Sequence, residues 1–212
     1  MRQKTVMCFG DSNTWGYPPE GGYRYDRNTR WPGVLQNELG SGYYVVEEGL
    51  CGRSTVWDDP IEGDKNGIKH LVPLLNSHAP LDLVIIMLGT NDLKNRFSVS
   101  AFDIAWSVGR LVDTVKNGTD AYAGAAPDVL VICPPPLGDM TTCPFKDMLV
   151  GGEEKSRQLS AVFAAFCKEK DIKMLDAGKI IESSPVDGVH FAPDQQIKLG
   201  KTIAAQVRKI IG

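Results

Sequence analysis

Thr5-Val6-Met7-Cys8-Phe9-Gly10-Asp11-Ser12 is the most informative segment for the fold, because an apolar run passes directly into a glycine and two polar residues. The run, residues 5–9, predicts a short buried strand. Gly10 allows a tight backbone at the end of this strand, so Ser12 is placed on a turn where a nucleophile can meet a ligand. Serine and aspartate are also common turn and cap residues, and this stretch alone therefore favours a structural role for Ser12.

Four further apolar runs rich in β-branched residues have the length of strands. The longer runs are continuous rather than alternating, as expected for a parallel sheet that helices cover on both faces. Segments with apolar residues at helical spacing separate the runs, so strands and helices alternate along the chain. The predicted strands are residues 5–9, 43–47, 81–88, 128–133 and 172–175, and the predicted helices are residues 29–39, 66–77, 101–116, 152–168 and a last one that starts after Pro193.

This alternation predicts an α/β fold, a three-layer α/β/α sandwich in which right-handed crossovers build an open, doubly wound parallel sheet. The chain has 212 residues, and one domain covering residues 1–212 is expected. Ligands of such sheets bind beyond the carboxyl ends of the strands. Two irregular stretches rich in glycine or proline follow strand ends, residues 16–28 and 134–151, and we expect them to line the pocket.

The composition argues against several classes of function. Hydrophobic residues make up 42% of the chain and charged residues 23%, which is typical of a globular protein. The formal net charge is −3 and the basic residues form no cluster, so neither nucleic acid nor a membrane is an expected partner. The apolar run at residues 6–9 is too short for a signal peptide, which favours a cytoplasmic location.

The cysteines indicate neither a disulfide framework nor a metal site. Their number is five, and no CxxC or Cys/His spacing is present. Cys8 and Cys133 lie within apolar runs and are expected to be small core residues. No metal or cofactor is implied by any motif.

A base for Ser12 is offered by the segment Asp187-Gly188-Val189-His190, which lies between the fifth predicted strand and the last predicted helix. A carboxylate three residues before an imidazole can reach back to the ring within a tight turn. Such a hydrogen bond sets the tautomer of the ring and stabilises the imidazolium that forms when it takes a hydroxyl proton. Asp187 and His190 are therefore the candidate partners of Ser12.

Two further strand ends carry groups that suit an oxyanion. Gly52 follows the second strand, where a glycine lets a backbone N–H approach a ligand, and Asn91 follows the third strand with a side-chain amide that can donate. Each residue alone is more typical of an ordinary turn. Their placement at the same sheet edge as Ser12 and His190 favours a role as oxyanion donors, together with the N–H of Ser12.

Taken together, Gly10-Asp11-Ser12, Gly52, Gly89-Thr90-Asn91-Asp92 and Asp187-Gly188-Val189-His190 resemble the ordered blocks of the SGNH (GDSL-like) hydrolase family. The resemblance covers almost the whole chain. It implies Ser12 as nucleophile, Asp187 and His190 as the rest of a catalytic triad, and Ser12, Gly52 and Asn91 as the oxyanion hole. It also implies a flavodoxin-like, five-stranded parallel sheet of order 2-1-3-4-5.

A narrower resemblance is to bacterial arylesterases and acyltransferases of that family, which prefer short acyl groups and some of which form homo-oligomers. The chain departs from the common pattern at three positions. Asn13 stands where a leucine usually follows the serine, and Cys51 and Gly52 stand where serine and alanine are common in the narrower group. These departures leave the triad intact and bear on specificity.

The resulting hypothesis is a serine esterase that hydrolyses short-chain, acetyl-like carboxylic esters, aryl esters among them, through an acyl-enzyme on Ser12, with acyl transfer where an alcohol replaces water. A carbohydrate O-deacetylase would use the same triad. A flavodoxin-like module that binds a phosphate at a helix N-terminus would share the same sheet without catalysis. Both alternatives stay open at this point.

Other polar and aromatic residues receive weaker assignments. Trp15, Tyr17 and Trp57 follow strand-end motifs and are candidates for the pocket lining, with core packing equally suitable for Trp57. Cys51 is a further candidate for the pocket lining or the core. Cys51 has no base beside it in the sequence, so a reactive thiol is disfavoured. The remaining candidates are assigned supporting or surface roles: local backbone hydrogen bonds for Asp11 and Asp92, surface or capping positions for His70 and His78, and a solvated or salt-bridged face for Glu47, Glu48, Asp58 and Asp59.

Overall fold

The computed structural model describes residues 2–117 and 126–212, and its sheet confirms the predicted architecture. Five parallel strands are hydrogen-bonded in the order β2-β1-β3-β4-β5. Gly10 at the end of β1 is in register with Gly49 of β2 and with Met87 of β3, so these three strands end together. The strands are β1 (Lys4–Gly10), β2 (Tyr43–Gly49), β3 (Leu83–Met87), β4 (Asp128–Cys133) and β5 (Lys173–Asp176).

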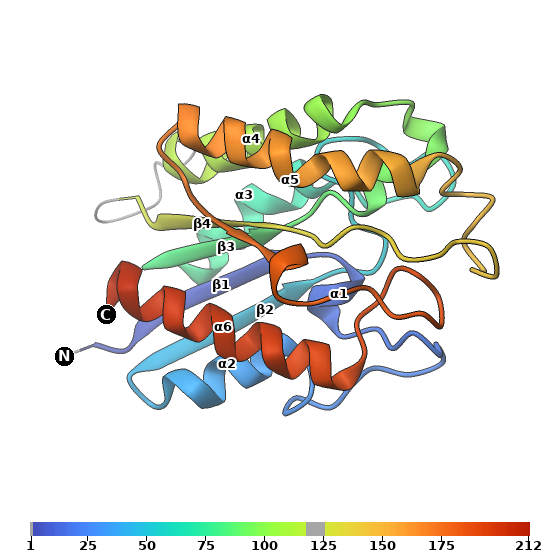
Figure 1. Cartoon of the computed structure of the whole chain (residues 1–212). Coiled ribbons are helices and arrows are strands. Elements are labelled where there is room, and N and C mark those ends of the chain that lie inside the picture. Colours follow the sequence, from blue (N-terminus) through green and yellow to red (C-terminus); the bar gives the residue numbers. More distant parts are fainter. Residues whose placement is uncertain (1, 118–125) are drawn as a thin grey trace.

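Helices cover both faces of this sheet and give the three layers seen in Figure 1. One face carries α3, α4 and α5, and the other carries α2 and α6, whereas the short α1 lies at the carboxyl end of β1. The helices are α1 (Ser12–Trp15), α2 (Trp31–Leu39), α3 (Gly67–His78), α4 (Ala101–Asn117), α5 (Gly152–Glu169) and α6 (Pro193–Ile211), with three short 3₁₀ helices, η1 (Asn91–Leu93), η2 (Asn95–Phe97) and η3 (Ala177–Lys179).

The core is divided between the two faces of the sheet because successive strand side chains point to opposite sides. In β1, Val6 and Cys8 belong to the cluster that packs against α2 and α6, whereas Met7 and Phe9 belong to the cluster under α3, α4 and α5. Helices thus cover hydrophobic strand side chains on both faces, which explains why the strand sequences are continuous hydrophobic runs. Cys8 and Cys133 are buried in this core, as predicted.

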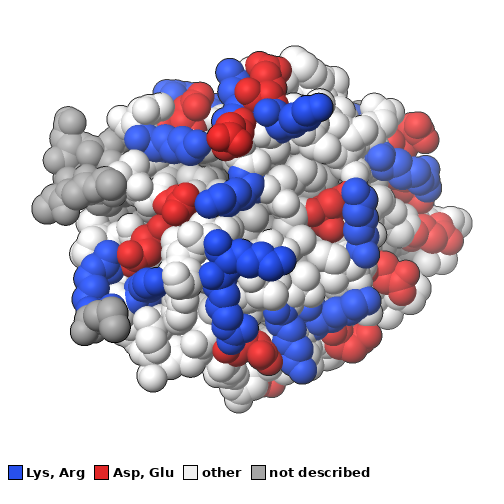
Figure 2. All heavy atoms as spheres, turned by 60° about the vertical axis from the view of Figure 1, so that its left-hand side comes forward, with Lys and Arg blue, Asp and Glu red and all other residues white. Residues whose placement is uncertain are grey.

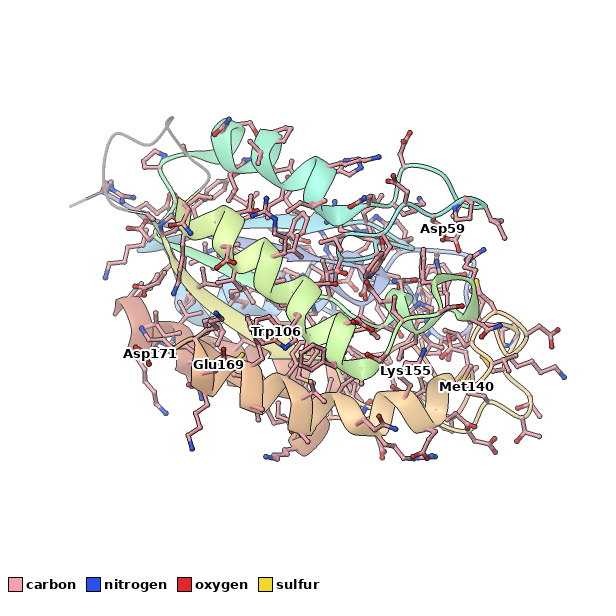
Figure 3. All side chains as sticks on the ribbon, turned by 90° about the horizontal axis from the view of Figure 1, so that it is seen from above. Asp59, Trp106, Met140, Lys155, Glu169 and Asp171 are labelled. Atoms are coloured by element: carbon pink, nitrogen blue, oxygen red, sulfur yellow. The ribbon has the colours of Figure 1, made fainter. Side chains whose placement is uncertain are left out.

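Aromatic packing joins α4 to α5 on the outer side of the larger cluster. Figure 3 shows these two helices side by side with Trp106 between them. The Trp106 ring lies 5.5 Å from the ring of Phe166 on α5, measured between centroids. At the right-hand end of the same view, Asp59 and Met140 mark two loops that extend past the carboxyl ends of the strands.

The predicted helices and strands are confirmed with small shifts of their ends. The second helix begins at Trp31 rather than at residue 29, because Thr29 and Arg30 donate their backbone N–H groups to the Asp26 carbonyl in a preceding turn. Pro32 then occupies the first turn of α2, where its missing N–H costs nothing. The short α1 directly after the first strand was not predicted.

The charged surface is mixed in sign on the face that Figure 2 shows, where lysine and arginine side chains alternate with aspartate and glutamate. No helix in residues 2–117 and 126–212 combines the length and the apolar composition that crossing a bilayer requires.

Candidate active site

Ser12 lies at the junction of β1 and α1, on a turn that only glycine at position 10 can form. A Cβ added to Gly10 would lie 2.0 Å from the Thr14 hydroxyl oxygen and 2.9 Å from the Met87 carbonyl oxygen. The Asp11 side chain caps α1 by accepting a hydrogen bond of 2.9 Å from the Asn13 N–H. The turn therefore holds the Ser12 side chain at the end of the sheet, 8% exposed.

His190 lies between Ser12 and Asp187, as the sequence predicted. Its Nε2 is 2.9 Å from the Ser12 hydroxyl oxygen, and its Nδ1 is 2.5 Å from Asp187 Oδ2. The other oxygen of Asp187 accepts the backbone N–H groups of Val189 and His190, each at 2.9 Å. The carboxylate thus orders both the loop and the ring, and the imidazole is in place to take the Ser12 proton.

The Asp187 carboxylate is kept ionised by its neighbours. Burial would raise its pKa, but the hydrogen bond and the charge of His190, with the backbone N–H groups of His190 and Val189, outweigh burial and lower the pKa below the ordinary value. An ionised Asp187 can hold Nδ1 protonated, which leaves Nε2 free to accept a proton from Ser12.

Two aromatic rings pack against the His190 imidazole. The ring centroid of Tyr17 lies 4.6 Å away and that of Phe145 lies 5.9 Å away, the latter edge-on. The two residues come from residues 16–28 and 134–151, the irregular stretches that were expected to line the pocket. Phe145 carries no individual signal in the sequence, because an aromatic residue in a loop matches no chemical motif.

Asn13, which stands in place of the common leucine, connects the serine turn to the histidine loop. Its side-chain amide donates to the Val189 carbonyl at 3.3 Å, and its own carbonyl accepts from Gln196 at 3.1 Å. Gln196 is completely buried on α6 and also accepts the Trp31 N–H at 2.9 Å. Gln196 therefore holds α1 and the start of α2 against α6, a role that no sequence motif indicated.

The three predicted oxyanion donors face one cavity with the Ser12–His190 pair. Asn91 begins η1, and Gly52 has a φ of +84°, a left-handed conformation that favours glycine. Within the described residues, no hydrogen bond to another protein group engages the N–H of Ser12, the N–H of Gly52 or the Asn91 side-chain amide. These donors are therefore free to bind a ligand oxygen.

The cavity has a volume of about 330 Å³ and two contrasting walls. This volume is near the lower limit for small-molecule sites, which suits a small acyl or alcohol group. One wall is largely apolar and the other is charged. The apolar wall is formed by Tyr17, Phe145, Met148, Leu149 and Val189, and the charged wall by Glu62, Lys65 and Lys94 beside Cys51, Gly52, Thr90 and Asn91.

Of the four pocket-lining candidates, Tyr17 and Cys51 line the cavity, whereas Trp15 and Trp57 do not. Cys51 lines the cavity, and burial and the nearby Asp11 charge raise the pKa of its thiol to about 11, so the thiol is not ionised at neutral pH. Trp15 is not among the lining residues; its ring packs on Tyr17 and carries the Arg24 guanidinium at 4.9 Å. Trp57 packs against the core under α3 and α4 instead.

Asp11 and Asp92 are buried carboxyls beneath the site. Burial raises the pKa of each to about 6, against partial compensation by hydrogen bonds from Asn13 to Asp11 and from Thr55 to Asp92. The prediction of local backbone bonds holds for Asp11. For Asp92 it is incomplete, because the carboxylate also accepts the Thr55 N–H at 3.0 Å and the Thr55 hydroxyl from the loop that follows β2.

Two other weakly assigned residues make contacts with partners distant in the sequence. His78 keeps a partly exposed position at the last residue of α3, where its Nε2 lies 2.7 Å from a carboxylate oxygen of Glu48, which lies near the end of β2, 30 residues earlier. Asp59 was placed on a solvated or salt-bridged face. It is salt-bridged but buried, with Lys94 as a partner at 3.3 Å. Neither contact could be anticipated from spacing along the chain.

The chain is similar to known esterases over almost its whole length. An aryl esterase from M. Smegmatis is 41% identical over 98% of this chain and 100% of that one, with a TM-score of 0.93. A carbohydrate acetylesterase from Sinorhizobium meliloti is also 41% identical, over 99% of this chain and 100% of that one, with a TM-score of 0.94. A search of curated proteins gave no match. The family model of the GDSL-like lipase/acylhydrolases matches residues 8–197, and the chain belongs to this family.

Proposed function

We propose that this protein hydrolyses short-chain carboxylic esters through an acyl-enzyme on Ser12. The observation that carries the proposal is the continuous chain from Asp187 through His190 to the Ser12 hydroxyl, with contacts of 2.5 and 2.9 Å. Such a chain activates a hydroxyl that is otherwise a weak nucleophile at neutral pH. Its position at a cavity with free N–H donors matches the requirements of acyl transfer.

In the proposed mechanism, His190 takes the Ser12 proton as the hydroxyl oxygen attacks the ester carbonyl. The N–H groups of Ser12 and Gly52 and the Asn91 amide stabilise the oxyanion of the tetrahedral intermediate, and imidazolium His190 then gives its proton to the leaving alcohol. Water, activated by the same imidazole, attacks the acyl-enzyme and releases the acid. Asp187 keeps the ring oriented and stabilises its charge in both steps, and no cofactor takes part.

The two cavity walls support two substrate classes. The rings of Tyr17 and Phe145 beside His190 offer an apolar surface for an aryl or alkyl ester, in line with the similarity to an aryl esterase. The charged wall with Glu62 and Lys65 favours an acetylated sugar as a second candidate, in line with the similarity to a carbohydrate acetylesterase. Rates on aryl acetates and on acetylated xylose oligomers distinguish the two.

The experiment that tests the proposal is labelling with a serine-reactive phosphonate, combined with turnover of a chromogenic acetate. The unsubstituted protein should be labelled at Ser12, and Ser12→Ala should be unlabelled and inactive while it keeps its circular dichroism spectrum. Absence of labelling in the folded protein would instead favour a flavodoxin-like binding module.

Further features follow from the same proposal and carry their own tests. A competing alcohol in the assay measures acyl transfer, and light scattering measures whether the chain assembles into a homo-oligomer. A cytoplasmic location and a single functional domain over residues 1–212 stay predictions from the sequence.

A further inference from the structure

A buried ammonium group lies in the charged wall of the cavity and has no part in the proposed mechanism. The Lys94 side chain is only 2% exposed, and its Nζ lies 2.6 Å from Glu62 Oε1 and 3.3 Å from Asp59 Oδ2. A buried charge is costly unless it is paired, and the two carboxylates supply that pairing. The Lys94 ammonium group is therefore held by the two carboxylates and is not hydrated by bulk water.

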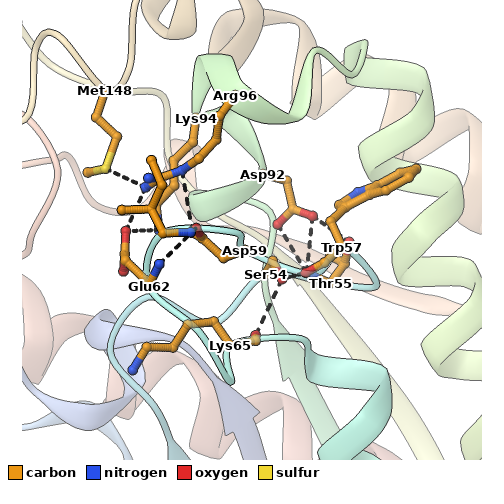
Figure 4. A network of polar contacts seen from close by, with 11 residues as sticks. Ser54, Thr55, Trp57, Asp59, Glu62, Lys65, Asp92, Lys94, Arg96 and Met148 are labelled. Carbon is orange, nitrogen blue, oxygen red and sulfur yellow. Dashed lines mark hydrogen bonds and ion pairs between the residues drawn. The ribbon is translucent and has the colours of Figure 1, made fainter.

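Arg96 completes a cluster of two cations and two anions, which we call the ion cluster: Asp59, Glu62, Lys94 and Arg96. Its Nη2 lies 2.7 Å from Glu62 Oε1, and its Nε lies 3.4 Å from Asp59 Oδ2. Figure 4 shows Lys94 and Arg96 both directed at Glu62 and Asp59. The formal charges of the cluster sum to zero, so removal of any one member leaves a buried charge without a full counter-charge.

The ion cluster joins the two chain segments that carry the proposed oxyanion donors other than Ser12. Lys94 follows η1 directly, and its N–H donates to the carbonyl of Asn91 at 3.2 Å. On the other segment, Glu62 reaches Gly52 so closely that a Cβ there would lie 2.5 Å from Glu62 Oε2. The contact between Glu62 and Lys94 therefore connects the segment that carries Gly52 to the segment that carries Asn91.

The two oxygens of Glu62 have different environments. Oε1 accepts from both Lys94 and Arg96, whereas Oε2 lies on the Cβ side of Gly52, whose N–H is a donor to the oxyanion in the proposed mechanism. An unpaired carboxylate at this position would repel the oxyanion. Lys94 and Arg96 neutralise Glu62, so the carboxylate can fill the space beside Gly52 without opposing the reaction.

We propose that Lys94 is a positioning residue of the oxyanion hole, which holds the Asn91 segment against the Gly52 segment and neutralises Glu62 beside the forming oxyanion. This inference rests on the proposed esterase function, because it concerns the same oxyanion. Lys94 acts through Glu62 and Asn91 and does not touch the substrate.

The test compares Lys94→Met, Lys94→Arg, Glu62→Gln and the double variant Lys94→Met/Glu62→Gln by kcat, KM and the rate constant of Ser12 phosphonylation. Lys94→Met should lower kcat and the phosphonylation rate roughly 10- to 100-fold with little change in KM, because misplaced donors act on the transition state. The double variant Lys94→Met/Glu62→Gln should have a kcat about tenfold higher than that of Lys94→Met alone, because Glu62→Gln removes the carboxylate charge that Lys94 no longer neutralises. Lys94→Arg should keep most of the activity.

The matched control is Lys69→Met, which removes an ammonium from an exposed pair with Asp58 at 2.7 Å, and kcat should not change. If Lys94 has only a structural role, the double variant is no faster than Lys94→Met, and that result overturns the inference. Should Lys94→Met fail to fold, the Glu62→Gln and Lys94→Arg variants still test the inference. A drop in kcat for Lys94→Arg as large as the loss for an Asn91→Ala variant would contradict it. Absence of labelling in the unsubstituted protein overturns the esterase proposal and this inference together, whereas labelling that no Lys94 variant slows overturns this inference alone.

Discussion

The base side and the oxyanion side of the site are held in opposite ways. Asp187 binds the ring and backbone of a residue three positions away, so the base side is a local turn. On the oxyanion side, Thr55 and Asp92 are 37 residues apart, and Glu62 and Lys94 are 32 residues apart. The base can therefore be identified from a short motif, whereas the support of the donors depends on contacts between loops that follow different strands.

The two sides of the site also differ in the direction in which the pKa of a buried carboxyl is shifted. Asp187 and Asp92 are both inaccessible to solvent, yet the pKa of Asp187 is lowered and that of Asp92 is raised to about 6. Burial raises both, and the imidazole of His190 reverses the direction for Asp187 alone. Thr55 offers Asp92 hydrogen bonds without a positive charge, and the nearby Asp11 raises its pKa further.

The largest expected effect lies on the base side. Asp187→Asn should lower kcat roughly 10³- to 10⁴-fold, because an asparagine amide favours the wrong tautomer of His190 and cannot stabilise the imidazolium. KM and the circular dichroism spectrum should stay close to those of the unsubstituted protein. Steady-state kinetics on a chromogenic acetate provides the measurement, and a variant that retains a tenth of the activity would contradict the role of Asp187.

A smaller loss is expected on the oxyanion side. Asn91→Ala should lower kcat by about 10²- to 10³-fold with little change in KM, because one donor to the oxyanion is lost. Asn95→Ala is the matched control, since this exposed asparagine lies on the following 3₁₀ helix and should retain full activity. Equal losses in the two variants would argue that the segment, rather than the Asn91 amide, matters.

The raised pKa of Asp92 predicts a pH dependence of stability. Between its ordinary value of 3.8 and about 6, the folded state keeps a proton that the unfolded state releases, so stability falls as pH rises through this window. Asp92→Asn lacks this titration. Its free energy of unfolding relative to the unsubstituted protein should therefore rise by up to about 3 kcal/mol between pH 4 and pH 8. Urea unfolding of both proteins at the two pH values measures the difference, and parallel curves would refute it.

The smallest effect is expected at Cys51, which lines the cavity next to Gly52. Cys51→Ser should keep kcat/KM within about threefold, because the hydroxyl fills a similar volume and the thiol, with a pKa of about 11, is not ionised at neutral pH. Treatment of the unsubstituted protein with iodoacetamide at neutral pH should be correspondingly slow to inactivate it. Rapid inactivation would assign Cys51 a chemical role.

Several features were predictable from the sequence because their causes are local. Continuous apolar runs and helical stripes predicted all five strands and the main helices, and the spacing of Asp187 and His190 predicted their hydrogen bond. Glycines at positions 10 and 52 were recognised because tight turns require them. The pocket lining was predicted in part: Tyr17 and Cys51 line the cavity as expected, whereas Trp15 does not, Trp57 packs against the core, and Phe145, which contacts His190, was not predicted.

The order of the chain was enough to place a serine, an imidazole and two donors after different strands of one sheet, since parallel strands bring their carboxyl ends to the same edge. The partners that hold these groups in position depended on the folded structure. A helix and a strand, α3 and β3, separate Glu62 from Lys94 and Thr55 from Asp92 along the chain. No periodicity of the sequence relates the side chains of either pair. Packing of the sheet and its loops brings each pair into contact. Once a charged side chain is removed from water, its partner is needed to stabilise the charge.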